Sequence, residues 1–179
     1  MQAAPNNQRP SRAGAGSASA AQALDPLDPT DRAIVRLLAQ DARMPNSAIA
    51  EAVGIAASTC HGRVRVLCER GVIRGFHADV DPAALGLGLQ AMIAVRLHTH
   101  TRAQIDAFHQ AVPRLPGVVG VYHVAGADDY LLHVAARDSD ALRDFVLDHL
   151  AGHPAVQHAE TSLIFSHLRG AAEALGFGD

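Results

Sequence analysis

The stretch STCHGRVRVLCERGVIRGF, which runs from Ser58 to Phe76, decides how the first half of the chain folds. Placed at 100° per residue, it separates into an apolar side and a polar, basic side. The apolar side carries Cys60, Val64, Leu67 and Cys68. The opposite side carries Ser58, His61, Gly62, Arg65 and Glu69. The pattern predicts an amphipathic helix over about residues 57–70, which Gly71 ends.

Two shorter helices are predicted on the N-terminal side of this one. In LDPTDRAIVRLLAQDARMP, Asp28 is a good N-cap and Pro29 suits the first helical position. The next segment, NSAIAEAVG, has Asn46 or Ser47 as its expected cap and Gly54 as its end. Three short helices with a glycine turn between the second and the third predict a helix-turn-helix.

The second half alternates between strand and helix patterns. In LQAMIAVRL, residues 89–97, every second side chain is apolar, which is typical of a strand with one buried face. A helix, two strands, a helix capped by Ser139 and a last strand are then predicted over residues 102–112, 116–126, 130–136, 139–150 and 156–168. The order βαββαβ predicts a ferredoxin-like fold, so the chain is α+β. The stretch VIRGFHADVD, residues 72–81, is typical of a strand or an extended connector, and residues 77–88 are expected to form a linker strand between the two halves.

Charge is distributed unevenly, although the formal net charge is only −3. Residues 28–77 hold seven arginines against five acidic residues, whereas residues 78–179 hold six arginines against twelve acidic residues. An excess of basic charge in the first half favours a module that faces a polyanion, joined to an acidic partner module.

The N-terminal segment and the cysteines indicate a cytoplasmic protein. Residues 1–26 hold almost no bulky apolar side chain, so they are expected to form a disordered arm, in which Arg9 and Arg12 are passive rather than DNA contacts. Cys60 and Cys68 are expected to stay free thiols, as in a reducing compartment. The sequence holds neither a signal peptide nor an apolar run long enough to span a membrane, so no membrane association is expected.

Three segments of the chain resemble the leucine-responsive/asparagine-operon regulators, the Lrp/AsnC family. They are LDPTDRAIVRLLAQDAR, SAIAEAVGIAASTCHGRVRVLCERGVIRGFHADVDPAALG and VAGADDYLLHV. The resemblance covers about residues 25–168 and rests above all on RVRVLCERGVI and GADDYLL, which occur in the family's order. It implies a feast-or-famine transcription regulator without a cofactor, a homodimer that assembles to an octamer and responds to a small effector, usually an amino acid.

The resemblance also divides the chain. Residues 27–76 would form a winged-type helix-turn-helix domain that binds double-stranded DNA. Residues 89–168 would form the ferredoxin-like domain for ligand binding and oligomerisation, followed by a C-terminal tail over residues 169–179.

In a helix-turn-helix, the start of the second helix of the motif points into the major groove. Together with the resemblance, this geometry predicts DNA contacts by Arg43, Ser58, Thr59, His61, Arg63, Arg65 and Arg74. Arg65 suits paired hydrogen bonds to guanine, and Arg43 and Arg74 are phosphate candidates. Arg63 lies at the edge of the buried side, where it is expected to contact a phosphate or to form an internal salt bridge.

Two positions depart from the family pattern. Relatives often carry a capping serine at position 56 and a basic residue at position 62, where this chain has Ala56 and Gly62. Ser58 is expected to take over as the cap. Gly62 is expected to change which bases are recognised more than whether DNA is bound.

The resemblance places the effector loop at the turn GADD and on the last strand. Gly126, Asp128 and Asp129 would lie in the loop, and Gln157 and Thr161 would face it across a subunit boundary. A carboxylate in such a loop suits the ammonium group of an amino acid, and glycine allows a close approach. The alternative is an ordinary hairpin turn with solvated acidic side chains.

Other classes of function have weaker support. The arginines of the first half could simply solvate a helix surface. The eleven histidines form no tight cluster in the sequence, so no metal site is expected. No motif for catalysis stands out, and the chain is not expected to be an enzyme, although sirohaem decarboxylases are similar to the same family. A second alternative is an assembly protein that has lost DNA binding, given Ala56 and Gly62.

Overall fold

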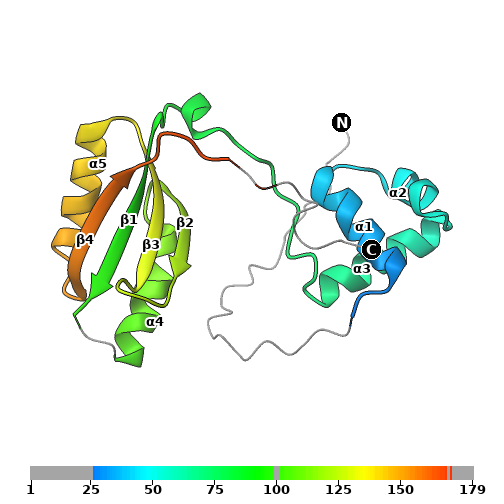
Figure 1. The fold of residues 1–179 in the computed structure, drawn as a ribbon, viewed down its shortest axis with the longest axis horizontal. Coiled ribbons are helices and arrows are strands. Elements are labelled where there is room, and N and C mark those ends of the chain that lie inside the picture. The colour runs from blue at the N-terminus through cyan, green and yellow to red at the C-terminus, as the bar shows by residue number, and fades with distance from the viewer. Residues whose placement is uncertain (1–25, 99–100, 169, 171–179) are drawn as a thin grey trace, which may run out of the picture.

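The computed structural model describes residues 26–98, 101–168 and 170. Figure 1 shows these residues as a helical unit and a sheet-containing unit, joined by an extended connector. Each unit has its own cluster of buried apolar side chains. The expected arm, apart from Pro26, and the expected tail, apart from Gly170, lie outside the described residues, so Arg9 and Arg12 do too.

The helical unit consists of three short helices. Their bounds are α1, Pro29–Gln40, α2, Asn46–Val53, and α3, Ala57–Glu69. They meet in a small core of fully or almost fully buried side chains, namely Ile34, Ile49, Ala50, Cys60 and Leu67. Because α3 follows α2 after a short glycine turn, with Gly54 at φ 71°, the predicted helix-turn-helix is confirmed.

The helix starts agree only in part with expectation. Asp28 is the N-cap of α1, since its carboxylate accepts a hydrogen bond from the amide of Asp31 at 2.7 Å. Neither Asn46 nor Ser47 caps α2, because the helix already begins at Asn46 after Pro45, which has no capping side chain. Ser58 does not cap α3 either, because the helix begins one residue earlier, at Ala57.

The sheet unit has the order β1 Leu89–Leu97, α4 Arg102–Ala111, β2 Val118–His123, β3 Tyr130–Ala136, α5 Ser139–Val146 and β4 Val156–Leu163. Its four antiparallel strands are arranged β2-β3-β1-β4, with β1 and β3 in the centre. This βαββαβ topology confirms the ferredoxin-like prediction.

Both helices of this unit pack on one face of the sheet. Alternate residues of β1 from Ala91 to Leu97 are buried there, together with Phe108 of α4 and Phe145 of α5. The helix cap differs from expectation, since Asp138 rather than Ser139 caps α5 through the amide of Ala141.

The strand expected in the connector is absent, whereas the alternative of an extended connector agrees with the structure. Residues 77–88 form no strand, because residues 74–81 lack regular structure and a 3₁₀ helix follows at Pro82–Leu85. Asp81 caps that 3₁₀ helix by accepting a hydrogen bond from Ala83. None of the helices in the described part of the chain is long and apolar enough to cross a membrane.

Candidate nucleic-acid interface and effector loop

The N-terminal half of α3 presents a continuous exposed surface. Cys60 and Leu67 are buried, so the opposite side of the helix faces outward. The residues on this side, called the reading surface below, are Ser58, Thr59, His61, Gly62 and Arg65. All are exposed except Gly62, which is partly covered but has open space where a Cβ would stand. A polynucleotide backbone or groove can therefore approach α3 closely at this position.

Arg65 is the arginine of the reading surface. Its side chain is 71% exposed and lies 3.6 Å from the carboxylate of Glu69, one turn further along the helix. An exposed pair at this distance is weak, so Arg65 can turn to another acceptor at little cost. The guanidinium is thus available for two parallel hydrogen bonds to a base edge or a phosphate.

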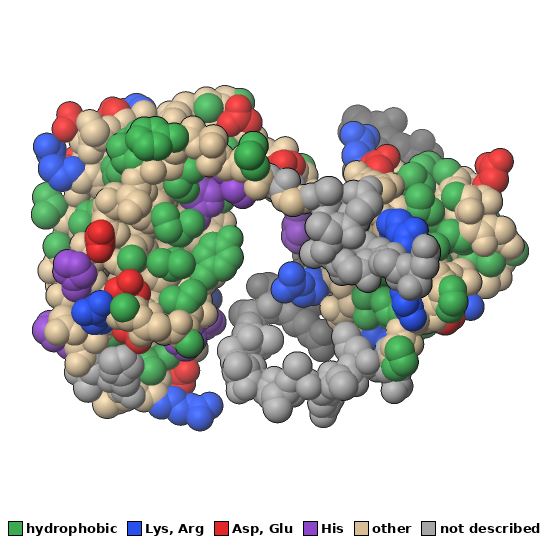
Figure 2. All heavy atoms as spheres, in the orientation of Figure 1, with side chains coloured by type: hydrophobic (Ala, Val, Ile, Leu, Met, Phe, Trp, Pro, Cys, Tyr) green, Lys and Arg blue, Asp and Glu red, His purple; other side chains and the backbone are tan. Residues whose placement is uncertain are grey.

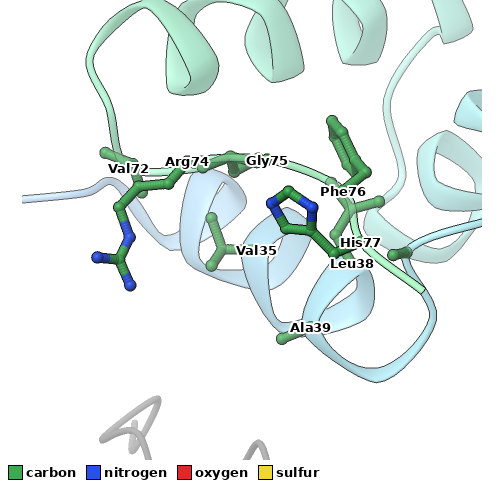
Figure 3. Close-up of a pocket in the computed structure, with 10 residues that line it drawn as sticks. Val35, Leu38, Ala39, Val72, Arg74, Gly75, Phe76 and His77 are labelled. Carbon is green, nitrogen blue, oxygen red and sulfur yellow. The ribbon is translucent and has the colours of Figure 1, made fainter. Parts of the chain in front are cut away.

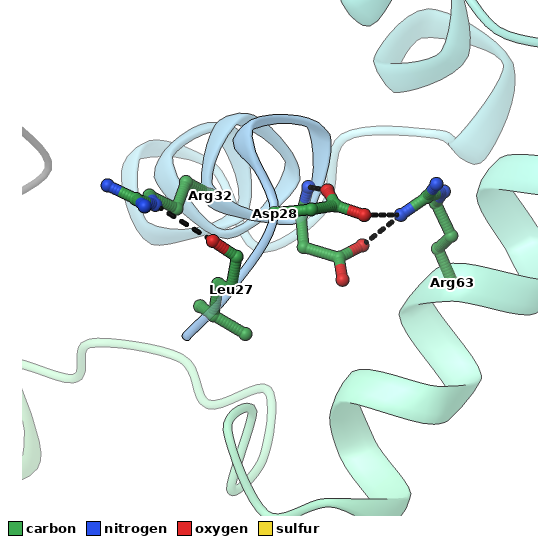
Figure 4. Close-up of polar contacts among 5 residues, drawn as sticks. Leu27, Asp28, Arg32 and Arg63 are labelled. Atoms are coloured by element: carbon green, nitrogen blue, oxygen red, sulfur yellow. Dashed lines mark hydrogen bonds and ion pairs between the residues drawn. The ribbon is translucent and has the colours of Figure 1, made fainter. Parts of the chain in front are cut away.

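Arg63, in contrast, forms ion pairs within the protein. Its guanidinium nitrogen Nη1 lies 2.6 Å from the carboxylate of Asp28 and 2.8 Å from that of Asp31, as Figure 4 shows for the start of α1. Of the two roles expected for Arg63, the structure shows the internal salt bridge. The pair fastens the middle of α3 to the N-terminus of α1.

The same contact changes the acidity of Asp28. The hydrogen bond from Arg63 lowers the pKa of the Asp28 carboxyl below its ordinary value of 3.8, and the amide of Asp31 lowers it further. Asp28 therefore has two tasks, since it caps α1 with one oxygen and holds Arg63 with the other.

We predict that Asp28→Ala lowers the free energy of unfolding by about 1 kcal/mol at neutral pH, the usual cost of a lost N-cap. The ion pair adds less than the cap, because the carboxylate is about half exposed. A carboxyl with a lowered folded-state pKa stabilises above its ordinary value and loses this effect as the pH falls through the lowered value. Denaturation in urea at several pH values measures the free energy of unfolding. The difference in this free energy between wild type and Asp28→Ala should become smaller in acid.

Asp28→Asn is the matched control, because the amide keeps a capping oxygen but does not titrate. The difference in free energy of unfolding between Asp28→Asn and Asp28→Ala should not depend on pH. A constant difference between wild type and Asp28→Ala down to the acid limit would contradict the role of the ionised carboxylate.

The remaining arginines of the predicted DNA set surround α3. Arg43 is exposed in the turn between α1 and α2, and Arg74 is exposed at the start of the connector. In Figure 3, Arg74 points away from α1, while the connector crosses that helix above Val35 and Leu38. Between α1 and the connector lies a hollow of about 430 Å³.

Figure 2 shows several arginines on the visible face of the helical unit.

The loop between β2 and β3 holds the acidic residues expected to bind an effector. Arg96 of β1 donates to the carbonyl oxygen of Ala127 at 2.6 Å and pairs with Asp128 at 3.3 Å. The carboxylate of Asp129 accepts a hydrogen bond from the amide of Leu97 at 2.8 Å. Gly126 is exposed and has φ 155°, a conformation that favours glycine. The acidic side chains are thus partly used to hold the loop against β1.

The two expected effector residues of the last strand lie at the edge of the sheet. Gln157 is exposed near the start of β4, where the neighbouring Val156 pairs with Leu97, so it shares an end of the sheet with the loop. Thr161 pairs with Ile93 in the middle of the sheet and is also exposed. Within one chain, therefore, only Gln157 is at the level of the loop.

The histidines serve mostly as aromatic neighbours. His123 stacks on Tyr130 with ring centroids 4.7 Å apart, and His153 meets Phe108 edge-on. Burial and the nearby His167 lower the pKa of His133, whose ring also bonds the side chain of Gln90. The described residues contain no group of three or more His, Cys, Asp or Glu side chains able to hold a metal ion. Of the eleven histidines of the sequence, His100 lies outside the described residues.

Both cysteines are free, as expected, with Cys60 buried in the core and Cys68 exposed on α3. Burial raises the pKa of the Cys60 thiol, which keeps it protonated and unreactive.

Sequence reasoning missed two contributors to these sites. One is Arg96, whose signal was a lone cation on the open face of a strand followed, later in the chain, by an acidic turn. The other is Asn46, whose side chain lies 3.2 Å from the ring of His61, 15 residues further along. No local pattern indicates such a contact, because it depends on the angle between α2 and α3.

The family models match both units of the chain. Residues 27–74 match the model described as winged helix-turn-helix DNA-binding, and residues 90–171 match the model of the Lrp/AsnC ligand binding domain. Among curated proteins, the HTH-type transcriptional regulator AldR of Mycobacterium tuberculosis is 58% identical over 142 residues, 79% of this chain and 79% of its own. The leucine-responsive regulatory protein of Rhizobium meliloti is 36% identical over 143 residues, 80% of this chain and 92% of its own.

Solved structures are also similar. The crystal structure of MtbAldR has a TM-score of 0.68 and 54% identity, and covers 81% of this chain and 99% of its own. A transcriptional regulator from Neisseria meningitidis, in complex with L-Met, has a TM-score of 0.74 and 32% identity, and covers 82% of this chain and 94% of its own.

Proposed function

The chain belongs to the Lrp/AsnC family of transcriptional regulators, and we propose that it is a sequence-specific DNA-binding regulator that responds to an amino acid. The observation that carries this proposal is the exposed reading surface on α3, in a helical unit separate from a unit matching a ligand-binding domain. We infer that the division into functional domains follows residues 27–76 and 89–168, with residues 77–88 as connector, and that the protein acts in the cytoplasm.

In the proposed complex, the N-terminal half of α3 enters the major groove. Ser58, Thr59, His61 and Arg65 then lie near base edges, while Arg43 and Arg74 on either side are suited to phosphates. The first backbone amides of α3 are a further site for a phosphate. Ala56 has no side chain that could cap them, so a phosphate oxygen can accept their hydrogen bonds instead.

The direct test is selection of bound duplexes from a randomised pool by the purified protein. We expect enrichment of one sequence whose two halves are related by a dyad, as a symmetric dimer requires. Recovery of duplexes without any common sequence would contradict sequence-specific regulation.

We propose that two copies associate through the open face of the sheet. The side opposite α4 and α5 carries the half-buried Met92, Ala94 and Leu131 and the exposed Tyr122, an apolar surface that is still partly accessible in the described part of the chain. Further association of dimers to an octamer would bring β4 of one subunit, with Gln157 and Thr161, toward the loop of another.

The effector is proposed to bind at the loop from Gly126 to Asp129. Support comes from the match to a ligand-binding domain and from the relative of known structure that holds L-Met. The loop combines a glycine with carboxylates, and Arg96 adds a cation that suits the carboxylate of an amino acid. An effector that prefers one assembly would shift the population of DNA-binding states.

We predict that one or a few of the twenty amino acids raise the melting temperature of the protein. A ligand at about 100 times its Kd stabilises the folded state by about 2.7 kcal/mol. A thermal-shift screen measures this, and Asp128→Asn should reduce the shift. Asp148→Asn, a change at an exposed aspartate after α5, is the control and should not. No shift with any amino acid would contradict an amino-acid effector.

A further inference from the structure

Asn46 and His61 form a contact between the two helices of the DNA-binding motif. Asn46 is the first residue of α2 and is half buried, whereas His61 is exposed on α3. The amide nitrogen Nδ2 of Asn46 lies 3.2 Å from the ring nitrogen Nδ1 of His61. Because Asn46 does not cap α2, its side chain is left for this contact.

The contact decides which hydrogen-bonding group His61 presents. An amide nitrogen only donates, so Nδ1 of His61 must accept, and the single proton of the neutral ring then lies on Nε2. The ring therefore offers an N–H donor at Nε2, the nitrogen on the side away from Asn46. Its orientation is also restricted, since rotation about the side chain would break the contact.

The surroundings leave room for a base at this place. Asn46, His61 and Arg65 line one hollow of about 540 Å³ beside α3, whose apolar wall includes Phe76 of the connector. Gly62, next to His61, has no atom within 4 Å of the place where a Cβ would stand. An approaching groove edge thus meets the donor of His61 without obstruction by its neighbour.

We propose that Asn46 is a positioning residue for base recognition, which holds His61 as an Nε2–H donor toward a base edge that offers an acceptor. The proposal rests on the proposed function. In the major groove, acceptors are N7 and O6 of guanine, N7 of adenine and O4 of thymine, whereas cytosine offers only its amino donor. The base that His61 contacts is therefore not cytosine.

Asn46 could act on DNA in a second way, which gives a different result. A direct bond from its amide to a phosphate would strengthen binding to every duplex equally, because phosphates carry no sequence information. A positioning role instead acts only at the base pair that His61 contacts and disappears when His61 is absent.

The test is a double-mutant cycle on the selected operator and on its variants with each base pair at each position. Wild type, Asn46→Ala, His61→Ala and the double variant are compared by fluorescence anisotropy, with Ser47→Ala as control on the same turn. We expect His61→Ala to remove the preference at one base-pair position. Asn46→Ala should reduce the preference at that position by about fivefold, the worth of one hydrogen bond. The double variant should equal His61→Ala, and Ser47→Ala should keep the preference.

Several outcomes overturn the proposal. They are additive losses, an equal loss on all duplexes in Asn46→Ala, and effects of the two residues at different positions. If the wild type selects no sequence, the proposed function fails and this inference fails with it. Specific binding with additive losses overturns the positioning role alone.

Discussion

Replacing Leu67 by alanine is expected to destabilise the helical unit by about 2–5 kcal/mol, the range for a buried leucine. Leu67 is fully buried in the small core formed with Ile34, Ile49 and Cys60, so the substitution leaves a cavity among these side chains. With so small a core, this loss removes most of the stability of the unit. DNA binding should disappear at the same time.

The chain offers a built-in way to observe this effect. It has no tryptophan and two tyrosines, Tyr122 and Tyr130, both in the sheet unit. Tyrosine fluorescence during denaturation in urea should therefore show an unchanged midpoint in Leu67→Ala, while helical circular dichroism is lost at a lower urea concentration. The control is Val66→Ala on the same helix, where the side chain is 43% exposed and the loss should be small. Equal losses in both variants would contradict the core as described.

Arg65→Ala is expected to weaken binding to the selected operator by about 1–3 kcal/mol, the worth of a good base contact. The side chain is exposed, weakly paired with Glu69, and one turn after His61 on the reading surface. Arg102→Ala is a suitable control, because this arginine is also strongly exposed, at 86% against 71% for Arg65, but belongs to α4 of the sheet unit. Anisotropy titrations with the operator and with an unrelated duplex measure the affinity of each variant for each duplex.

The loss in Arg65→Ala should be larger for the operator than for the unrelated duplex. An equal loss on both would assign Arg65 to a phosphate. Unchanged binding to both would show that the outward side of α3 does not face DNA.

Periodicity predicted the elements well where one face is buried. Strand β1 was expected over its observed range, because alternation is unambiguous when every second residue contacts the core. The strand prediction for the connector was wrong for the opposite reason. The stretch VIRGFHADVD has β-branched and aromatic residues, but no neighbouring strand pairs with it in the described structure. Strand propensity without a partner does not make a strand.

The sequence was sufficient to predict which residues lie on an exposed surface, but not which side chains contact one another. The sequence placed His61 and Arg65 outward on α3, which agrees with their exposure. The partners of Arg63 lie 35 and 32 residues away, and the partner of Arg96 lies 32 residues away. Such pairs depend on how helices and strands cross, so local spacing could not choose between the two roles of Arg63.

The measurement that tests the central claim most directly is binding of the selected operator at two salt concentrations. Two helix-turn-helix units with three phosphate contacts each should lose about a thousandfold in affinity between about 50 mM and about 200 mM salt. Anisotropy of a labelled duplex measures this. A steep loss is the result we predict. Absence of binding at the lower salt concentration, or affinity that does not change with salt, would contradict a DNA-binding function for the helical unit.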